Sequence, residues 1–477
     1  MRKSQGLLII LLAFLLVVVS IPQKSSAKFV DLTGGIKNEY TYEEYIFLTG
    51  QPIRFTGTSK DVKVTTTKSG NKITEKYSIK LVGPNSSTLT RDFTYVSNVS
   101  DYDTIGQSTA TGDVTRFKEI IKIGSVTYTL ADYQLSKSVI TDKRAASDYF
   151  SGNAIFRKTY TYKLRNGLQQ EITVNGYGKN VGYENYWGAT ETQIMEYVYS
   201  FADGREGLVK NRVSHSKSKT LNYEENPASQ SSFDGGYSVN TDADTMSEYT
   251  YELPSGTGTI EFNSEYMPRI ERLIVPKFRD LSKHWAKPSI EKLYSLGIFT
   301  DNSNFFSPNT PMLRYDFAIA VAKATDRRVE LEKQTQKPVA KPNLFNDVRT
   351  SRVDYNYLVS AVNKGVIAGM GPKTFQPEGR LTRQQAATIL VRALGFEGKA
   401  PDPGYKTHYT DDAKIANYAR DAVYVVTELG LMHGDGTKFN PTGTLTRAES
   451  ASLIVRFLLY LENDLKQNYR DDILFFE

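Results

Sequence analysis

Three arginines occupy equivalent positions of an internal repeat in the C-terminal part of the chain. Each lies six residues beyond the proline of a Phe-x-Pro motif. The three sets are Phe306 with Arg314, Phe375 with Arg383, and Phe439 with Arg447. Each copy also opens with an aromatic residue that is followed two positions later by an aspartate: Asp280, Asp347 or Asp411. The same spacing in three copies predicts three structural units of one kind.

The position of these arginines favours an anionic ligand. An amphipathic helix is expected to begin at each of them, as the apolar spacing Ala386, Ile389, Leu390, Ala393 and Leu394 indicates. A cation in the first turn opposes the helix dipole, at a cost of about 0.3–1 kcal/mol. A cation kept there in all three copies therefore indicates a partner such as a carboxylate, which the guanidinium and the helix N-terminus would both favour. Surface ion pairing is the alternative.

Capping residues mark the start of the same helices. Thr446 with Glu449, and Thr382 with Gln385, have the T-x-x-E/Q spacing of a capping box. This role alone would explain the threonines and the glutamate, but not the arginines.

Three further motifs characterise the repeat. They are Phe278-Arg279-Asp280-Leu281 with His284-Trp285-Ala286, then Gly434-Asp435-Gly436, then Leu445-Thr446-Arg447-Ala448-Glu449. With these motifs the segment from Pro276 to Leu461 resembles three S-layer homology modules. The resemblance implies an all-α, pseudo-threefold bundle. It also implies noncovalent binding to a secondary cell-wall polysaccharide, typically one that carries pyruvate ketals.

The resemblance further implies roles for single residues. The three aspartates would contact sugar hydroxyls or hold the arginines, and the arginines would bind the carboxylate. Trp285 would either stack on a sugar or pack in the core as part of an apolar helical stripe. Glu449, Gly434 and Gly436 complete the candidate wall-polymer site. Val353 replaces the tryptophan in the second copy, so not all three grooves need bind.

The region from Lys28 to Val275 has the composition of a β-structure. It is rich in Tyr, Thr, Ser, Val and Ile, and apolar residues alternate with polar ones from Lys72 to Leu81. Asn166-Gly167 predicts a two-residue hairpin turn, and Asn175-Gly176 a further turn. Tyrosines two positions apart, such as Tyr197 and Tyr199, share one face of a strand; they would pack across strands or form a carbohydrate platform. We expect an antiparallel sandwich or an elongated sheet.

The sequence contains no recognisable catalytic constellation. There are no cysteines and four histidines among 477 residues, and neither H-E-x-x-H, G-x-S-x-G nor a glycine-rich phosphate loop occurs. We therefore expect no enzyme, no metal site and no cofactor. The alternative is a wall-anchored, polysaccharide-active enzyme with its site in the β-rich region. That alternative would need two facing carboxylates in an aromatic cleft.

The first residues predict secretion. A cationic start, Met1-Arg2-Lys3, precedes an apolar run from Leu7 to Val19, and small residues up to Ala27 fit cleavage after that position. An uncleaved anchor or a buried helix is the alternative. The formal net charge of +6 is small for this length, which argues against nucleic acid as a partner. We expect a protein of the cell wall or cell surface, without a membrane span after cleavage, that could associate with itself in a surface layer.

The expected organisation has eight segments. They are a signal peptide (1–27), a displayed β-rich region (28–275), a first module (276–325), a linker (326–343), a second module (344–394), a linker (395–408), a third module (409–461) and a tail (462–477).

Overall fold

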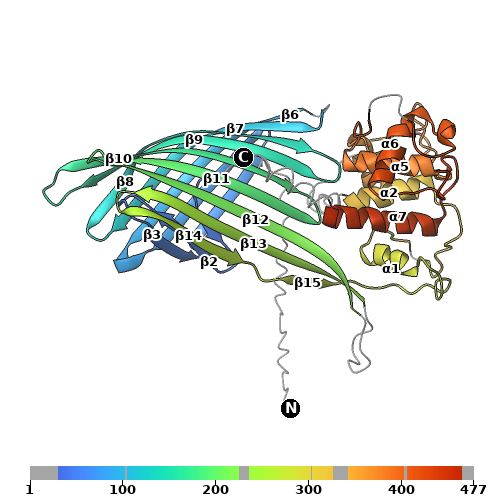
Figure 1. Ribbon diagram of the computed structural model, residues 1–477, viewed down its shortest axis with the longest axis horizontal. Helices are drawn as coiled ribbons and strands as arrows, with labels where there is room; N and C mark the ends of the chain where they lie inside the picture. Colours follow the sequence, from blue (N-terminus) through green and yellow to red (C-terminus); the bar gives the residue numbers. More distant parts are fainter. Residues whose placement is uncertain are drawn as a thin grey trace, which may run out of the picture.

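The computed structural model describes residues 31–102, 105–224, 236–301, 303–325, 342–401 and 406–464. An all-β region is followed by a group of short helices (Figure 1). The expected signal peptide, most of the linker 326–343 and most of the tail 462–477 lie outside the described residues. Of the helices that the structure describes, none is both long and apolar enough to cross a membrane.

The N-terminal region forms one antiparallel sheet of 15 strands. The strands are β1 (Ile36–Lys37), β2 (Thr41–Ile46), β3 (Ile53–Thr58), β4 (Val62–Ser69), β5 (Lys72–Val82), β6 (Thr88–Tyr102), β7 (Gln107–Ile123), β8 (Val126–Lys143), β9 (Asp148–Lys163), β10 (Gln169–Glu184), β11 (Gly188–Ser200), β12 (Glu206–Glu224), β13 (Gly236–Leu253), β14 (Gly256–Glu265) and β15 (Arg269–Arg272). Most pair with the next strand in the chain, but β3 pairs with β5, which also pairs with β4, and β15 pairs with β13. The elongated antiparallel sheet is thus confirmed, and the two-sheet sandwich is wrong.

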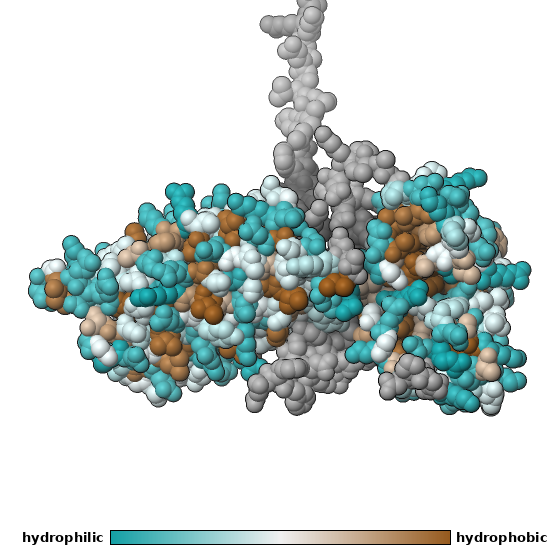
Figure 2. Space-filling model, turned by 90° about the horizontal axis from the view of Figure 1, so that it is seen from above, coloured by the Kyte–Doolittle hydropathy of each residue, from teal (hydrophilic) through white to brown (hydrophobic). Residues whose placement is uncertain are grey.

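The sheet has one apolar face, around which it curls. Buried and exposed residues alternate along most of β8, and β5 has the predicted alternation. The sheet curls enough for β1 to contact β13 and β14 near the opposite edge. Phe55, Ile79 and Tyr249 are almost fully buried in the core that the curl encloses. On the β-rich part of the surface seen in Figure 2, apolar residues lie in small separate groups among hydrophilic ones.

The two Asn-Gly pairs have different roles. Asn166-Gly167 does connect β9 and β10, as predicted, but the N–H of Leu164 donates to the carbonyl of Leu168, which makes a three-residue loop with only Gly167 at positive φ (83°). The second pair does not form a turn, because it lies inside β10. Gly176 is needed there because a Cβ would come within 2.0 Å of the Phe156 ring.

The helical region contains six α-helices among the described residues. They are α1 (Lys287–Ser295), α2 (Arg314–Thr325), α4 (Tyr355–Asn363), α5 (Arg383–Leu394), α6 (Arg420–Glu428) and α7 (Arg447–Leu459). The second helix of each copy begins at the repeat arginine, as predicted. Phe317, Leu390 and Ile454 from these three helices are fully buried in one shared core.

One end of the sheet packs against the helices. Ala145, Ala146, Trp187 and Val239 of the β-rich region belong to the same apolar cluster as the helical core. The hydroxyl of Tyr237 in β13 donates to the carbonyl of Pro288 in α1 at 3.1 Å. The two regions are therefore joined by buried apolar side chains as well as by the chain itself.

Candidate functional site

Each repeat aspartate holds the Phe-x-Pro turn of its own copy. Asp411 accepts hydrogen bonds from the backbone N–H groups of Phe439 and Asn440, both at 2.9 Å. Asp280 and Asp347 bind the equivalent turns in the same way, at 2.7–3.1 Å. The residue between phenylalanine and proline has positive φ in all three turns (55–59°), so the carboxylate fixes a conformation that the backbone disfavours. Among the described residues, none of these three aspartates forms a hydrogen bond or ion pair with a repeat arginine.

Electrostatics support this assignment for two of the aspartates. Burial alone would raise the pKa of Asp280 and of Asp347. The backbone N–H groups of the turns outweigh burial and lower both pKa values below the ordinary range. These carboxylates are therefore ionised, and they are already hydrogen-bonded to the backbone of the turns.

Each repeat arginine reaches into the next module. The Nε of Arg383 donates to the carbonyl of Phe439 at 2.8 Å and its Nη2 to the carbonyl of His433 at 2.6 Å. Its guanidinium also lies 4.9 Å from the centre of the Phe439 ring. Arg314 makes the same contacts with Phe375 and Ala368 of the second module.

The third arginine closes the cycle and differs from the other two. The Nε of Arg447 donates to the carbonyl of Phe306 in the first module at 2.9 Å. Its Nη2 meets a carboxylate, Asp301, at 3.1 Å, where the other two arginines meet a backbone carbonyl. Backbone hydrogen bonds before the helix starts form a second cycle in the opposite sense: the N–H of Met312 donates to the carbonyl of Leu445, Leu445 to Leu381, and Leu381 back to Met312, at 2.8–3.0 Å.

A groove of about 280 Å³ lies beside Arg383, and we call it the Trp285 groove. Its lining comes from all three modules: Trp285 from the first, Arg383 from the second, and Met432, His433, Leu445, Glu449, Ser452, Leu453 and Arg456 from the third. Trp285 is 63% exposed, so core packing on a helical stripe is wrong for this residue. It precedes α1 by two residues, in a turn that leaves the indole at the surface.

A second groove, of about 260 Å³, lies beside Arg447, and we call it the Arg352 groove. Its two arginines are matched by carboxylates, while Lys323, which also lines it, donates to Thr300 Oγ1 at 3.1 Å. Arg447 pairs with Asp301, and Arg352 lies 3.4 Å from Asp354 and 3.9 Å from Asp316. Val353, at the position equivalent to Trp285, precedes α4 by two residues and is 89% exposed.

The surroundings of Arg314, the remaining repeat arginine, are equivalent in the repeat to the two grooves. Arg314 is only 7% exposed. Burial lowers the pKa of its guanidinium, and the charge of Arg392 lowers it further. Arg392 is itself paired with Glu397 at 3.0 Å. Tyr418, which precedes α6 by two residues and is 55% exposed, stands where the first module has its tryptophan.

The remaining predicted site residues shape helix ends and turns. The N–H of Thr446 donates to Glu449 Oε2 at 2.8 Å, and the N–H of Glu449 donates to Thr446 Oγ1 at 3.2 Å, which confirms that capping box. A Cβ at Gly434 would lie 2.1 Å from the carbonyl oxygen of Lys438, and Gly436 has φ of 100°. The two glycines thus form the tight turn that follows His433, whose carbonyl receives Arg383.

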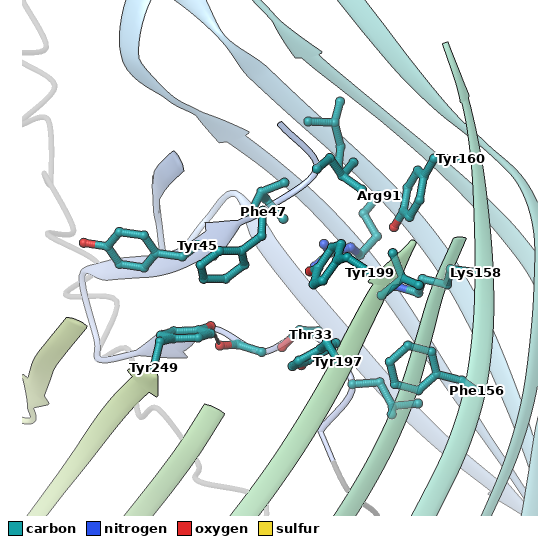
Figure 3. Close-up of a pocket in the computed structure, with 16 residues that line it drawn as sticks. Thr33, Tyr45, Phe47, Arg91, Phe156, Lys158, Tyr160, Tyr197, Tyr199 and Tyr249 are labelled. Carbon is teal, nitrogen blue, oxygen red and sulfur yellow. Dashed lines mark hydrogen bonds between the residues drawn. The ribbon is translucent and has the colours of Figure 1, made fainter. Parts of the chain in front are cut away.

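A separate polar cluster is buried inside the curled sheet (Figure 3). Arg91 donates to both carboxylate oxygens of Glu44 at 3.0 Å and through Nε to Glu119 at 2.8 Å. Glu119 also accepts from Tyr160 at 2.8 Å and lies 3.7 Å from Lys158. Burial raises the pKa of Glu44; in Glu119 burial is outweighed by Arg91 and Lys158, and the pKa falls. All five residues are at most 7% exposed.

The cavity beside this cluster is small. Its volume is about 50 Å³, which is space for a water molecule or two and not for a sugar. The segment before β1 lies across it: Asp31 exchanges two hydrogen bonds with Gln193 at 2.6 and 2.7 Å, and Asn211 donates to the carbonyl of Gly34 at 3.1 Å. Within the described residues, no group of three or more side chains is arranged to hold a metal ion.

The comparisons agree with the geometry of the helical region. The model of the S-layer homology domain matches three times, at residues 277–318, 344–387 and 408–451. The C-terminal region therefore carries three S-layer homology domains, whereas the β-rich region has no family match.

Curated relatives include both surface-layer proteins and glycosidases. The S-layer protein sap of Bacillus anthracis is 29% identical over 36% of this chain and 20% of its own length. An amylopullulanase of Thermoanaerobacterium thermosulfurigenes is 29% identical over 45% of this chain and 11% of its own length. An endoglucanase of Bacillus sp. (strain KSM-635) is 31% identical over 38% and 18%. The chain thus spans at most about a fifth of the length of these relatives. The domains and the S-layer relatives together indicate a cell-surface location.

Sequence reasoning did not identify the full lining of the grooves. It assigned residues module by module, but the Trp285 groove takes residues from all three modules. It also missed Arg456. A signal was present, because a cation stands nine residues after each repeat arginine: Lys323, Arg392 or Arg456.

Proposed function

We propose that this is a secreted cell-surface protein that binds a secondary cell-wall polysaccharide noncovalently through its three S-layer homology domains. The single observation that carries the proposal is the Trp285 groove, in which an exposed indole lies beside two guanidinium groups. An indole face can stack on a sugar ring, and guanidinium groups recognise carboxylates by charge-assisted hydrogen bonds. This combination fits a sugar that bears a carboxylate, such as one with a pyruvate ketal.

The cyclic contacts support a pseudo-threefold arrangement of the modules as part of this proposal. Every arginine lies against the Phe-x-Pro turn of the following module, and the third returns to the first. Each groove is thus bounded by elements of more than one module. The arginines have a structural role in this arrangement, and we propose that they use their remaining edge to bind the ligand.

The β-rich region is in our proposal the part that the anchor displays. The charged groups of its interior cluster are paired with one another, and the cavity beside them has a volume of only about 50 Å³. We propose that this region has a structural or ligand-binding role, which includes self-association in a surface layer.

The experiment is rebinding of the full chain to purified cell walls. Protein released by a chaotrope should rebind after dilution to walls that carry pyruvate ketals, and rebind much less to walls from which the ketals were removed by mild acid. Walls stripped of the secondary polysaccharide should not bind. Failure to rebind to intact walls would refute anchoring, and equal binding to ketal-free walls would refute recognition of the carboxylate.

The alternative proposal is a wall-anchored enzyme acting on polysaccharides, which the glycosidase relatives and the carboxylate pair Glu44 and Glu119 bring into consideration. Both carboxylates are bound to Arg91 and buried, and the adjacent cavity is too small for a sugar. This geometry favours a structural role. Release of reducing sugars from starch, xylan or cellulose by the full chain, abolished in Glu119→Gln, would support the enzyme instead.

A further inference from the structure

The two grooves and the surroundings of Arg314 differ in how far their cations are already neutralised. In the Trp285 groove, Arg383 donates only to backbone carbonyls, and Arg456 forms no ion pair with any described residue. Both side chains line the same groove. Partial desolvation and the charge of Arg383 lower the pKa of Arg456, which shows that the two cations repel each other.

The one carboxylate among the lining residues of this groove, Glu449, is hydrogen-bonded to the helix cap. Glu449 Oε2 accepts hydrogen bonds from the backbone N–H and the hydroxyl of Thr446, at 2.8 and 2.9 Å, as part of the helix cap. It stabilises Arg383 electrostatically, but it makes no ion pair with it. Two guanidinium groups therefore share a groove with one carboxylate that faces the cap.

The Arg352 groove is the opposite case. Asp301 sits against Arg447 Nη2, where the Trp285 groove has the carbonyl of His433 against Arg383. Asp316 and Asp354 flank Arg352 in the same groove. An incoming carboxylate would have to displace Asp301 and would meet two more negative charges. Near Arg314, the charge of Arg392 is paired with Glu397, and Arg314 itself is almost completely buried.

We infer that the Trp285 groove is the principal anion-binding groove, that Arg456 is a second cationic ligand in it beside Arg383, and that Asp301 makes the Arg352 groove a poor site for an anionic sugar. This inference rests on the proposed function and specifies which groove performs it. A volume of about 280 Å³ suits a single sugar residue. The sugar would stack on Trp285 with its carboxylate between the two guanidinium groups.

Arg456 is the informative residue to change because its side chain makes no hydrogen bond to any residue that the structure describes. Arg456→Gln keeps the length and polarity of the side chain while removing its charge. Lys323→Gln is the matched control, because Lys323 holds the equivalent position in the Arg352 groove. Trp285→Ala and Val353→Ala form a second matched pair.

The measurement is isothermal titration of the full chain with a wall oligosaccharide that carries its pyruvate ketals. Loss of a charge-assisted contact predicts that Arg456→Gln weakens binding by about ten- to a hundredfold. Trp285→Ala should weaken it by about tenfold or more. Lys323→Gln and Val353→Ala should change the affinity by less than about threefold. Melting temperatures should stay unchanged in Arg456→Gln.

Three outcomes would overturn the inference. If unmodified protein binds but Arg456→Gln binds equally well, Arg456 is not a ligand, although the proposed function stands. If Lys323→Gln has the larger effect, the Arg352 groove is the site. If the ketal-free oligosaccharide binds as well as the intact one, or inorganic phosphate competes equally with pyruvate, the groove does not select a carboxylate. Failure of the unmodified protein to bind at all would instead refute the proposed function.

Discussion

Replacing Asp411 by alanine separates a structural role of the repeat aspartates from a role in ligand binding. Its two oxygens accept the N–H groups of Phe439 and Asn440 at 2.9 Å. Phe439 is completely buried, so its unpaired N–H would cost about 1–3 kcal/mol. The exposed Asn440 would add less, because water can replace the carboxylate. We expect Asp411→Ala to lower the free energy of unfolding of the helical region by about 2–4 kcal/mol.

Thermal unfolding followed by the helical circular dichroism signal measures this effect. For a folding unit of this size, about 2–4 kcal/mol corresponds to a fall of roughly 5–12 °C in melting temperature. Asp435→Ala is the matched control: this carboxylate also accepts two backbone N–H groups, at 2.7 and 2.9 Å, but it is exposed, and little change is expected. An Asp411→Ala protein that melts normally but no longer binds walls would refute the structural assignment.

Three further predictions concern acid and two glycines. Backbone N–H groups hold the pKa of Asp347 below that of an unfolded aspartate. The stability that this carboxylate contributes is therefore present above about pH 4 and is lost as the pH falls through the folded pKa; a melting temperature of the helical region that does not fall as the pH is lowered below about 4 would contradict this. Gly434→Ala should weaken the turn before Lys438 by about 2 kcal/mol or more, and unchanged melting would show that the turn can adjust. Gly176→Ala should destabilise the sheet by about 1–3 kcal/mol because of Phe156, and replacing Phe156 by leucine should recover part of the loss; no recovery would exclude the proposed clash.

Local features of the helical region could be predicted from the sequence because they depend on short spacings. The helix starts at Arg383 and Arg447 and the box formed by Thr446 and Glu449 require only neighbouring residues, and all were predicted correctly. The grooves could not be predicted in the same way. Spacing along one copy does not say that Trp285 of the first module lies beside Arg383 of the second.

The grouping of residues into grooves changes what the sequence differences mean. In the second copy Val353 replaces the tryptophan. From the sequence alone, Arg383 of the same copy was therefore expected to belong to the weakest site. In the structure Arg383 shares a groove with Trp285 of the first module, and Val353 does not line that groove. In our proposal Arg383 therefore belongs to the principal groove, although its own copy lacks the tryptophan.

The β-rich region shows the same limit at another scale. Alternation in β5 gave its inner face, and Asn166-Gly167 gave a hairpin, because pleat and turn are local. The signal of Asn175-Gly176 was misleading because the same pair also suits a strand where a ring from β9 needs space. Composition favoured strands without saying how many would join one sheet.

The cyclic contacts between the modules have a consequence for how such a chain can change during evolution. Since the lining of the Trp285 groove is drawn from all three modules, a single copy of the repeat carries only a fraction of it. Loss of one copy would therefore remove more than one third of the binding capacity, and gain of a fourth would add no complete groove. A substitution in one copy would be felt in whichever groove its residue lines and not in the copy that bears it. The triplet, not the repeat, would then be the smallest unit on which selection for wall binding can act.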